Sequence, residues 1–108
     1  MIPQLAAPDL KAWLEDAARA RPVVLDVREP WEHALCAIEG SRHLPMQEIP
    51  ARVGELPRGA DIVVLCHHGM RSLQVADFLA QAGFEKVHNL AGGIAAWADQ
   101  VEPSMARY

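Results

Sequence analysis

The sequence predicts an α/β fold in which a parallel sheet of about five strands is covered by helices on both faces. Two observations lead to this prediction. Short apolar runs alternate along the chain with segments whose apolar residues recur every three or four positions, as strands and helices alternate in such folds. The run at residues 62–66 is apolar at every position, which is typical of a strand that is buried on both faces.

The first half of the chain is expected to contain three strands and three helical segments. In order, these are an edge strand at residues 2–5, a helix at 8–18, a strand at 23–25, a helical turn at 30–35, a strand at 42–44 and a short helix at 45–53. Pro8 suits the first position of its helix, because the first turn leaves its N–H groups unpaired. Ala7 stands at the N-cap without a side-chain acceptor, so this helix is expected to fray at its start. Pro50 is expected to interrupt the last helix.

The second half is expected to contain two strands and two helices. These are a central strand from residue 62 to Cys66, a helix at 73–82, a strand at 86–90 and a helix at 94–99. Gly83 suits the left-handed stop of the first of these helices, and the pair Gly92 and Gly93 allows a tight turn into the second. We therefore expect one domain at residues 1–100, followed by a weakly ordered C-terminal tail at 101–108.

Length, charge and cysteine content limit the functional classes. The 108 residues are enough for one hydrophobic core, and the net charge of -4 gives no general attraction to nucleic acid or to an anionic membrane. No apolar stretch approaches the roughly 18 residues that span a bilayer, and no basic region followed by an apolar segment opens the chain. Two cysteines are not the dense disulfide framework of a small secreted domain, so a cytoplasmic location is expected.

Cys66 ends the central strand and is followed by a polar turn that leads into a helix. In such sheets, ligands collect at the carboxyl ends of strands, and the unpaired N–H groups of a first helical turn favour negative charge. A cysteine with a pKa of about 8.5 is only a few per cent thiolate at neutral pH, and a helix terminus lowers that pKa by about one unit. A buried core cysteine needs no polar neighbours, yet this turn gathers His67, His68, Gly69 and Arg71.

The loop at residues 66–72, Cys-His-His-Gly-Met-Arg-Ser, resembles the active-site loop of the rhodanese family of sulfurtransferases. Four more blocks resemble family signatures in the family's order, at residues 25–32, 38–45, 82–84 and 90–97. The resemblance covers about residues 2–97. Ordered blocks of this kind are far more specific than a lone Cys-x-x-Gly.

The resemblance implies a rhodanese-like fold and a thiosulfate sulfurtransferase. Cys66 would be the catalytic residue and would carry sulfur as a persulfide from a small anionic donor such as thiosulfate to cyanide, a small thiol or a protein thiol. The substrate-binding loop would consist of His67, His68, Gly69, Met70, Arg71 and Ser72. Asp26 and Arg28 at the end of the neighbouring strand would support this loop. No metal and no organic cofactor is expected, and the protein is expected to be a monomer or a weak dimer.

Other functions stay open at this point. Rhodanese-like domains also occur as sulfur relays or regulatory binding modules with little thiosulfate turnover, although the presence of Cys66 favours catalysis or relay. Related phosphatases and arsenate reductases place Arg six positions after the cysteine, whereas Arg71 lies five positions after Cys66. This shorter loop is expected to be too tight for a tetrahedral phosphate. A zinc site is disfavoured, because consecutive ligands on a tight loop do not easily close a tetrahedron; the candidate ligands are Cys66, His67, His68 and His43.

Two features depart from the family pattern. His67 and His68 occupy the start of the loop, where Arg is more usual, which leaves the donor preference open. Imidazole titrates near physiological pH, with an unperturbed pKa of about 6.5. Cys36 replaces a glycine. The chain must descend from the carboxyl edge before the next parallel strand climbs back, so we expect Cys36 at the amino edge, opposite Cys66, and no disulfide between them.

Overall fold

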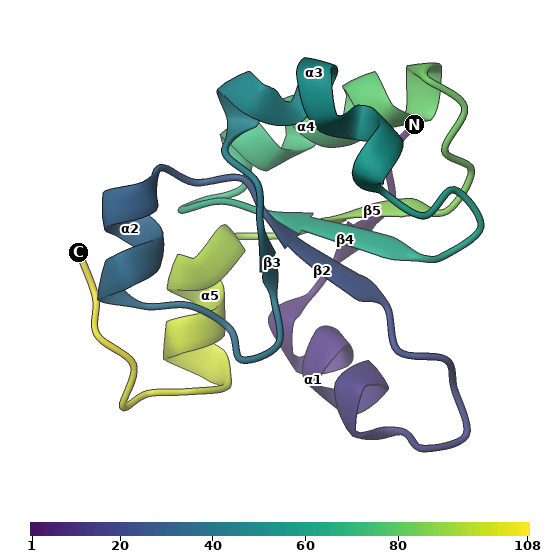
Figure 1. Ribbon diagram of the computed structural model, residues 1–108. Coiled ribbons are helices and arrows are strands. Elements are labelled where there is room, and N and C mark those ends of the chain that lie inside the picture. Colours follow the sequence, from purple (N-terminus) through teal and green to yellow (C-terminus); the bar gives the residue numbers. More distant parts are fainter.

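Five strands form one parallel sheet in the computed structural model, which describes residues 1–108 (Figure 1). The strands are β1 (Gln4–Leu5), β2 (Val23–Asp26), β3 (Arg42–His43), β4 (Ile62–Leu65) and β5 (Val87–Leu90). Their order across the sheet is β1-β5-β4-β2-β3, so β4 lies in the middle. The predicted α/β class and the central place of this strand are confirmed.

Helices cover both faces of the sheet, as predicted. The helices are α1 (Ala7–Glu15), α2 (Pro30–Leu35), α3 (Ile49–Arg52), α4 (Met70–Gln81) and α5 (Gly93–Gln100), and the 3-10 turns η1 (Met46–Glu48) and η2 (Val53–Glu55) flank α3. In Figure 1, α1 and α5 lie on one face of the sheet, and α3 and α4 lie on the other. No helix combines the length and the apolar character that crossing a lipid bilayer requires.

The two faces of β4 pack into two separate cores. Ile62 and Val64 face the cluster that includes α4, whereas Val63 and Leu65 face the cluster that includes α1 and α5. All four side chains are fully buried. This double burial explains why the strand has no polar position, since successive side chains of a strand point to opposite faces.

Three prolines lie in the first turns of helices: Pro8 in α1, Pro30 in α2 and Pro50 in α3. Pro8 lies in the first turn of α1, which starts at Ala7 and has no side-chain hydrogen bond at its N-cap Ala6. The predicted N-cap position is wrong by one residue: Ala6, not Ala7, is the N-cap, and it also lacks a side chain that could accept a hydrogen bond. The prediction that Pro50 interrupts a helix is wrong: Pro50 lies in the first turn of α3, where no backbone hydrogen bond is lost.

The tail at residues 101–108 packs against the domain, so the prediction that it is weakly ordered is wrong. Met105 is buried in the same core as α1 and α5. The Trp97 indole donates to Glu102 Oε1 at 3.1 Å, and the Arg107 guanidinium donates to the Ala98 carbonyl at 2.9 Å. Figure 1 shows the tail running past α5 toward α2, which brings its last residue to the carboxyl edge of the sheet.

The start of α5 supports the loop that contains Cys66. The N–H groups of Ile94 and Ala95 donate to the carbonyls of Cys66 and His67 at 2.9 and 3.1 Å. Gly93 has a φ of 60°, and a Cβ there would lie 2.4 Å from the His67 carbonyl oxygen and 2.5 Å from that of Cys66. Only glycine therefore lets α5 approach the loop this closely.

We expect Gly93→Ala to lower the free energy of unfolding by at least about 2 kcal/mol, because the methyl group collides with the loop backbone and strains a left-handed residue. Urea unfolding monitored by tryptophan fluorescence measures this loss. Gly54→Ala is the matched control: a Cβ there meets no atom within 4 Å, so no loss is expected. Similar losses in both variants would contradict the close packing of α5 on the loop.

Candidate active site

The carboxyl ends of β2 and β4 bring the predicted site residues to one edge of the sheet. Asp26, the last residue of β2, pairs in register with Leu65, the residue before Cys66. The Val27 N–H donates to the Leu65 carbonyl at 3.1 Å, so the two strand ends stay joined past the sheet. The predicted placement of Asp26 beside the loop is confirmed.

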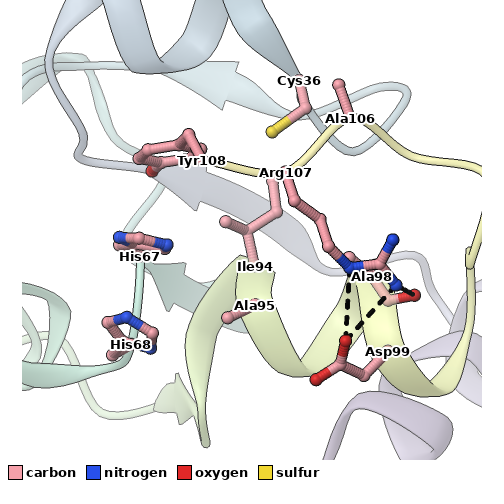
Figure 2. A pocket seen from close by; sticks show the side chains of 10 residues that line it. All are labelled: Cys36, His67, His68, Ile94, Ala95, Ala98, Asp99, Ala106, Arg107 and Tyr108. Atoms are coloured by element: carbon pink, nitrogen blue, oxygen red, sulfur yellow. Dashed lines mark hydrogen bonds and ion pairs between the residues drawn. The ribbon is translucent and has the colours of Figure 1, made fainter.

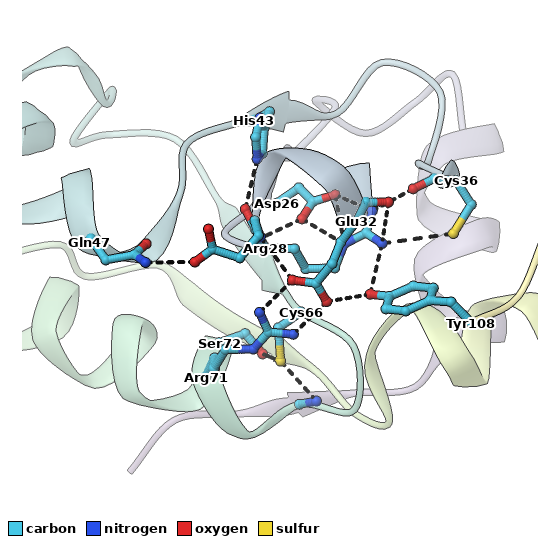
Figure 3. Close-up of polar contacts among 12 residues, drawn as sticks. Asp26, Arg28, Glu32, Cys36, His43, Gln47, Cys66, Arg71, Ser72 and Tyr108 are labelled. Atoms are coloured by element: carbon cyan, nitrogen blue, oxygen red, sulfur yellow. Dashed lines mark hydrogen bonds and ion pairs between the residues drawn. The ribbon is translucent and has the colours of Figure 1, made fainter. Parts of the chain in front are cut away.

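Cys66 lies at the bottom of its loop with 1 % of its surface exposed. The Gly69 N–H donates to the sulfur at 3.1 Å, and the Ser72 Oγ lies 3.4 Å from it (Figure 3). Burial by itself raises the pKa of the Cys66 thiol. Hydrogen bonds from the Ser72 hydroxyl and from the N–H groups of Ser72, Gly69 and His68 outweigh burial, so the pKa lies below its ordinary value. The loop therefore favours a thiolate.

The Ser72 hydroxyl has a second partner in Asn89. Its Oγ lies 2.6 Å from Asn89 Oδ1, and the Asn89 amide donates to the Gly69 carbonyl at 3.2 Å and to Gln4 Oε1 at 3.0 Å. A hydroxyl has one proton, so Ser72 donates either to Asn89 or to the sulfur. Asn89 thus holds both the hydroxyl and the backbone of the loop in place.

Arg71 forms a two-pronged ion pair with Glu32 of α2. Its Nη1 and Nη2 lie 2.7 and 2.8 Å from the two carboxylate oxygens, as Figure 3 shows. The Tyr108 hydroxyl donates to Glu32 Oε2 at 2.7 Å, and the Glu29 N–H donates to Oε1 at 2.9 Å. The Arg71 hydrogen bond, helped by those of Tyr108 and Glu29, outweighs burial and lowers the pKa of Glu32 to about 2. Arg71 is thereby held by a neighbouring element.

Asp26 and Arg28 form a second ion pair, with 2.7 Å between Oδ2 and Nη2, and both side chains are fully buried. Arg28 also donates to the carbonyls of Cys36 at 2.6 Å and Glu32 at 3.3 Å, and to the Tyr108 hydroxyl at 3.1 Å. These bonds fix α2 and the tail, so Arg28 acts on the loop through Glu32.

Three aromatic rings stack beside the loop. The Tyr108 and His67 ring centroids are 4.0 Å apart at 18°, and those of His67 and His68 are 4.0 Å apart at 26°. Burial lowers the pKa of His67 from its ordinary value, and the charges of His68, Arg71 and Arg28 act in the same direction against Glu32. His67 is therefore mainly neutral at physiological pH. Burial also raises the pKa of Tyr108 to about 12, with the Arg28 and Glu32 hydrogen bonds acting in opposite directions.

Cys36 lies on the active-loop side of the molecule, so its predicted place at the amino edge is wrong. Together with His67, His68 and Tyr108, it lines a cavity of about 180 Å³ (Figure 2). The six residues of α2 span only about 9 Å, and Arg28 holds the Cys36 carbonyl at the carboxyl edge. The chain therefore returns toward the amino edge of the sheet only in the residues after Cys36. Both thiols are free in the structure.

The remaining predicted residues have separate environments. Met70 begins α4 and is largely exposed. His43 bonds to the Arg28 carbonyl through Nε2 at 2.8 Å and stacks on His33, with 4.4 Å between the ring centroids. No group of three or more His, Cys, Asp or Glu side chains is arranged to hold a metal ion.

Sequence reasoning missed Glu32, Asn89 and Tyr108. A signal existed for Glu32, which follows Arg28 by four residues on a short helix at the edge where Arg71 needs a counter-charge. Asn89 is a polar residue at a buried position of β5, where it demands partners. Tyr108 has no local signal, because only the return of the tail brings it to the loop.

Known proteins resemble this chain in sequence and in structure. The family model for the rhodanese-like domain matches residues 6–100. A sulfurtransferase of Allochromatium vinosum is 37% identical over 106 residues, which are 98% of this chain and 97% of that protein. Thiosulfate sulfurtransferase GlpE of Ectopseudomonas mendocina is 39% identical over 75 residues, 69% of each chain. The crystal structure of a rhodanese-related protein from Thermoplasma volcanium, 32% identical, superposes with a TM-score of 0.83 over 94% of this chain and 95% of that one.

We expect Ser72→Ala to raise the pKa of the Cys66 thiol by about one unit, because a hydrogen bond to a charged group is worth about 1.5 kcal/mol. The pH dependence of thiolate absorbance measures the shift. Ser104→Ala, which removes an exposed hydroxyl from the tail, is the control. An unchanged pKa in Ser72→Ala would mean that Ser72 serves Asn89 alone.

We expect Glu32→Gln to make the free energy of unfolding less dependent on pH in the acidic range. The pKa of Glu32 is about 2 in the fold and about 4.3 in an unfolded chain, so its charge stabilises the fold above about pH 4. That stabilisation, on the order of 3 kcal/mol, disappears as the pH falls from about 4.3 to about 2. Urea unfolding across this range measures the wild-type advantage, which should shrink toward low pH. The control Glu15→Gln removes an exposed carboxylate of α1, and an equal effect there would contradict the assignment.

Proposed function

The chain belongs to the rhodanese-like domain family, and from this membership we propose that it is a sulfurtransferase that carries sulfane sulfur as a persulfide on Cys66. The donor is a sulfane-sulfur compound such as thiosulfate, and the acceptor is a thiophile such as cyanide, a small thiol or a protein thiol. Similarity to sulfurtransferases along nearly the whole chain supports sulfur transfer as the reaction class.

The environment of the Cys66 sulfur carries this proposal. The sulfur is buried at the end of β4, accepts a hydrogen bond from the Gly69 N–H at 3.1 Å, and has a lowered pKa. A thiolate, not a thiol, is the nucleophile in sulfur exchange. N–H groups that point at the sulfur also stabilise the negative charge of a persulfide in the same loop.

The transfer has two steps that balance in atoms and charge. The Cys66 thiolate attacks the outer sulfur of thiosulfate, the S–S bond of the donor breaks, and sulfite leaves with the electron pair of that bond. An acceptor thiolate or cyanide then attacks the outer sulfur of the persulfide, and the Cys66 thiolate leaves. Neither step consumes an oxidant, a reductant or a cofactor.

A sulfur relay is the second candidate, and one observation favours it. Arg71, the loop cation that would dock a small anion, is paired with Glu32. A relay would receive sulfur from a protein or organic persulfide and would turn over thiosulfate slowly. Phosphate-ester or arsenate chemistry has no comparable support, because the loop places Arg71 only five residues after Cys66.

Intact-mass measurement of the reduced protein tests the proposal. Incubation with a sulfane-sulfur donor should add one sulfur atom, and cyanide should remove it. Cys66→Ala should gain nothing, whereas Cys36→Ala should load like the wild type. Loading from an organic persulfide with little from thiosulfate would support the relay; no adduct from either donor would overturn the proposal.

A further inference from the structure

We infer, on the basis of the proposed function, that Glu32 determines donor specificity: by pairing with Arg71 it disfavours dianionic donors such as thiosulfate and favours uncharged organic persulfides. The relevant geometry is the two-pronged pair, with N–O distances of 2.7 and 2.8 Å. The Arg71 side chain is 35% exposed, so an incoming anion can reach it, but the anion meets a guanidinium that is already neutralised.

Glu32 is not free to swing away from Arg71. Its side chain is only 4% exposed, and it accepts bonds from the Tyr108 hydroxyl at 2.7 Å and from the Glu29 N–H at 2.9 Å. The Tyr108 hydroxyl is itself held by Arg28, whose Nη1 lies 3.1 Å away. Together these donors hold the carboxylate beside Arg71, so the loss of one of them weakens that hold. The Glu32 carboxylate is thus a fixed counter-charge to Arg71 in the site.

Neighbouring cations do not replace Arg71. Arg28 is fully buried and paired with Asp26. Arg107, which lines the adjacent cavity, lies 3.3 Å from a carboxylate oxygen of Asp99. His67 is stacked between two rings and mainly neutral at physiological pH. Each arginine near the loop therefore has a carboxylate partner, and the main attraction left for an anion comes from the loop N–H groups.

An organic persulfide avoids this electrostatic handicap, because it donates its outer sulfur in the protonated, uncharged form R–S–S–H. In its reaction, the Cys66 thiolate attacks the outer sulfur of R–S–S–H, the S–S bond breaks, and the thiolate R–S⁻ leaves with the bonding electrons. Cys66 then holds –S–S–H, so atoms and charge balance. A neutral donor brings no charge toward Glu32, whereas thiosulfate brings two negative charges. At short range, the repulsion between these charges and the Glu32 carboxylate discriminates strongly between the two donors.

The charge preference of the loop can be measured without sulfur transfer. Iodoacetate and iodoacetamide alkylate a thiolate by the same reaction but differ by one negative charge, so the ratio of their rates cancels changes in the Cys66 pKa. With alkylation mapped to the Cys66 peptide, Glu32→Gln should raise the iodoacetate-to-iodoacetamide ratio about tenfold, and Arg71→Gln should lower it. The double variant should return toward the wild-type ratio, because it removes a neutral pair. Glu15→Gln, which breaks an exposed pair on α1, should leave the ratio unchanged.

Donor kinetics complete the test. Glu32→Gln should raise kcat/KM for thiosulfate about tenfold and change kcat/KM for 2-hydroxyethyl persulfide by less than threefold. Tyr108→Phe, which retains the Arg71 pair but removes one bond to Glu32, should shift both readouts in the same direction by a smaller factor. It keeps the test decisive if Glu32→Gln unfolds.

The outcomes separate the two levels of inference. If the iodoacetate-to-iodoacetamide ratio does not change in Glu32→Gln or in Tyr108→Phe, the specificity role is overturned, even where Cys66 loads with sulfur. Equal losses with both donors in Glu32→Gln, without a change in the ratio, would show a structural role instead and would also overturn it. Ratios that follow the expected cycle in a protein that loads from neither donor would support the charge selection and overturn the proposed function alone.

Discussion

The buried pair of Asp26 and Arg28 is the interaction on which the site depends. Neither charge is exposed to water, and a buried charge without its partner is strongly unfavourable, so the two residues define each other's positions. Arg28 uses its remaining donors on α2 and on Tyr108, which ties a helix and the tail to the end of β2. Glu32 is thereby fixed, and through Glu32 the guanidinium of Arg71. One ion pair thus organises groups from four parts of the chain around the loop.

The loop is held from the opposite side by backbone contacts. The first N–H groups of α5 bond to the Cys66 and His67 carbonyls, and Gly93 permits that approach. Asn89 of β5 adds bonds to Ser72 and to the Gly69 carbonyl. Between these supports, the sulfur faces N–H groups that need no rearrangement when its charge changes. Fixed dipoles of this kind stabilise charge more effectively than mobile water.

The fold class and the position of Cys66 at the end of a buried strand could be predicted from the sequence, because both depend on local pattern. An apolar run such as Ile62–Leu65 predicts a buried strand, and a cysteine at the carboxyl end of that strand indicates a candidate active site. The pairing of Arg71 with Glu32 depends instead on where a six-residue helix lies over the loop, which no spacing rule gives. Cys36 was misplaced for the same reason: the helix is too short to cross the sheet. Tyr108 could not be predicted as a site residue, because the residues it contacts are all far from it in the sequence.

Tyr108 is the one tyrosine of the chain, and it lies against His67 and Glu32 at the edge of the site. Its absorption and near-ultraviolet circular dichroism therefore report on a single, known position. Since its pKa is raised to about 12, the phenol stays protonated throughout the range in which thiols ionise. Tyrosinate absorption, which overlaps that of thiolates, is consequently absent from that range, and the cysteines of this protein can be followed optically without correction for it.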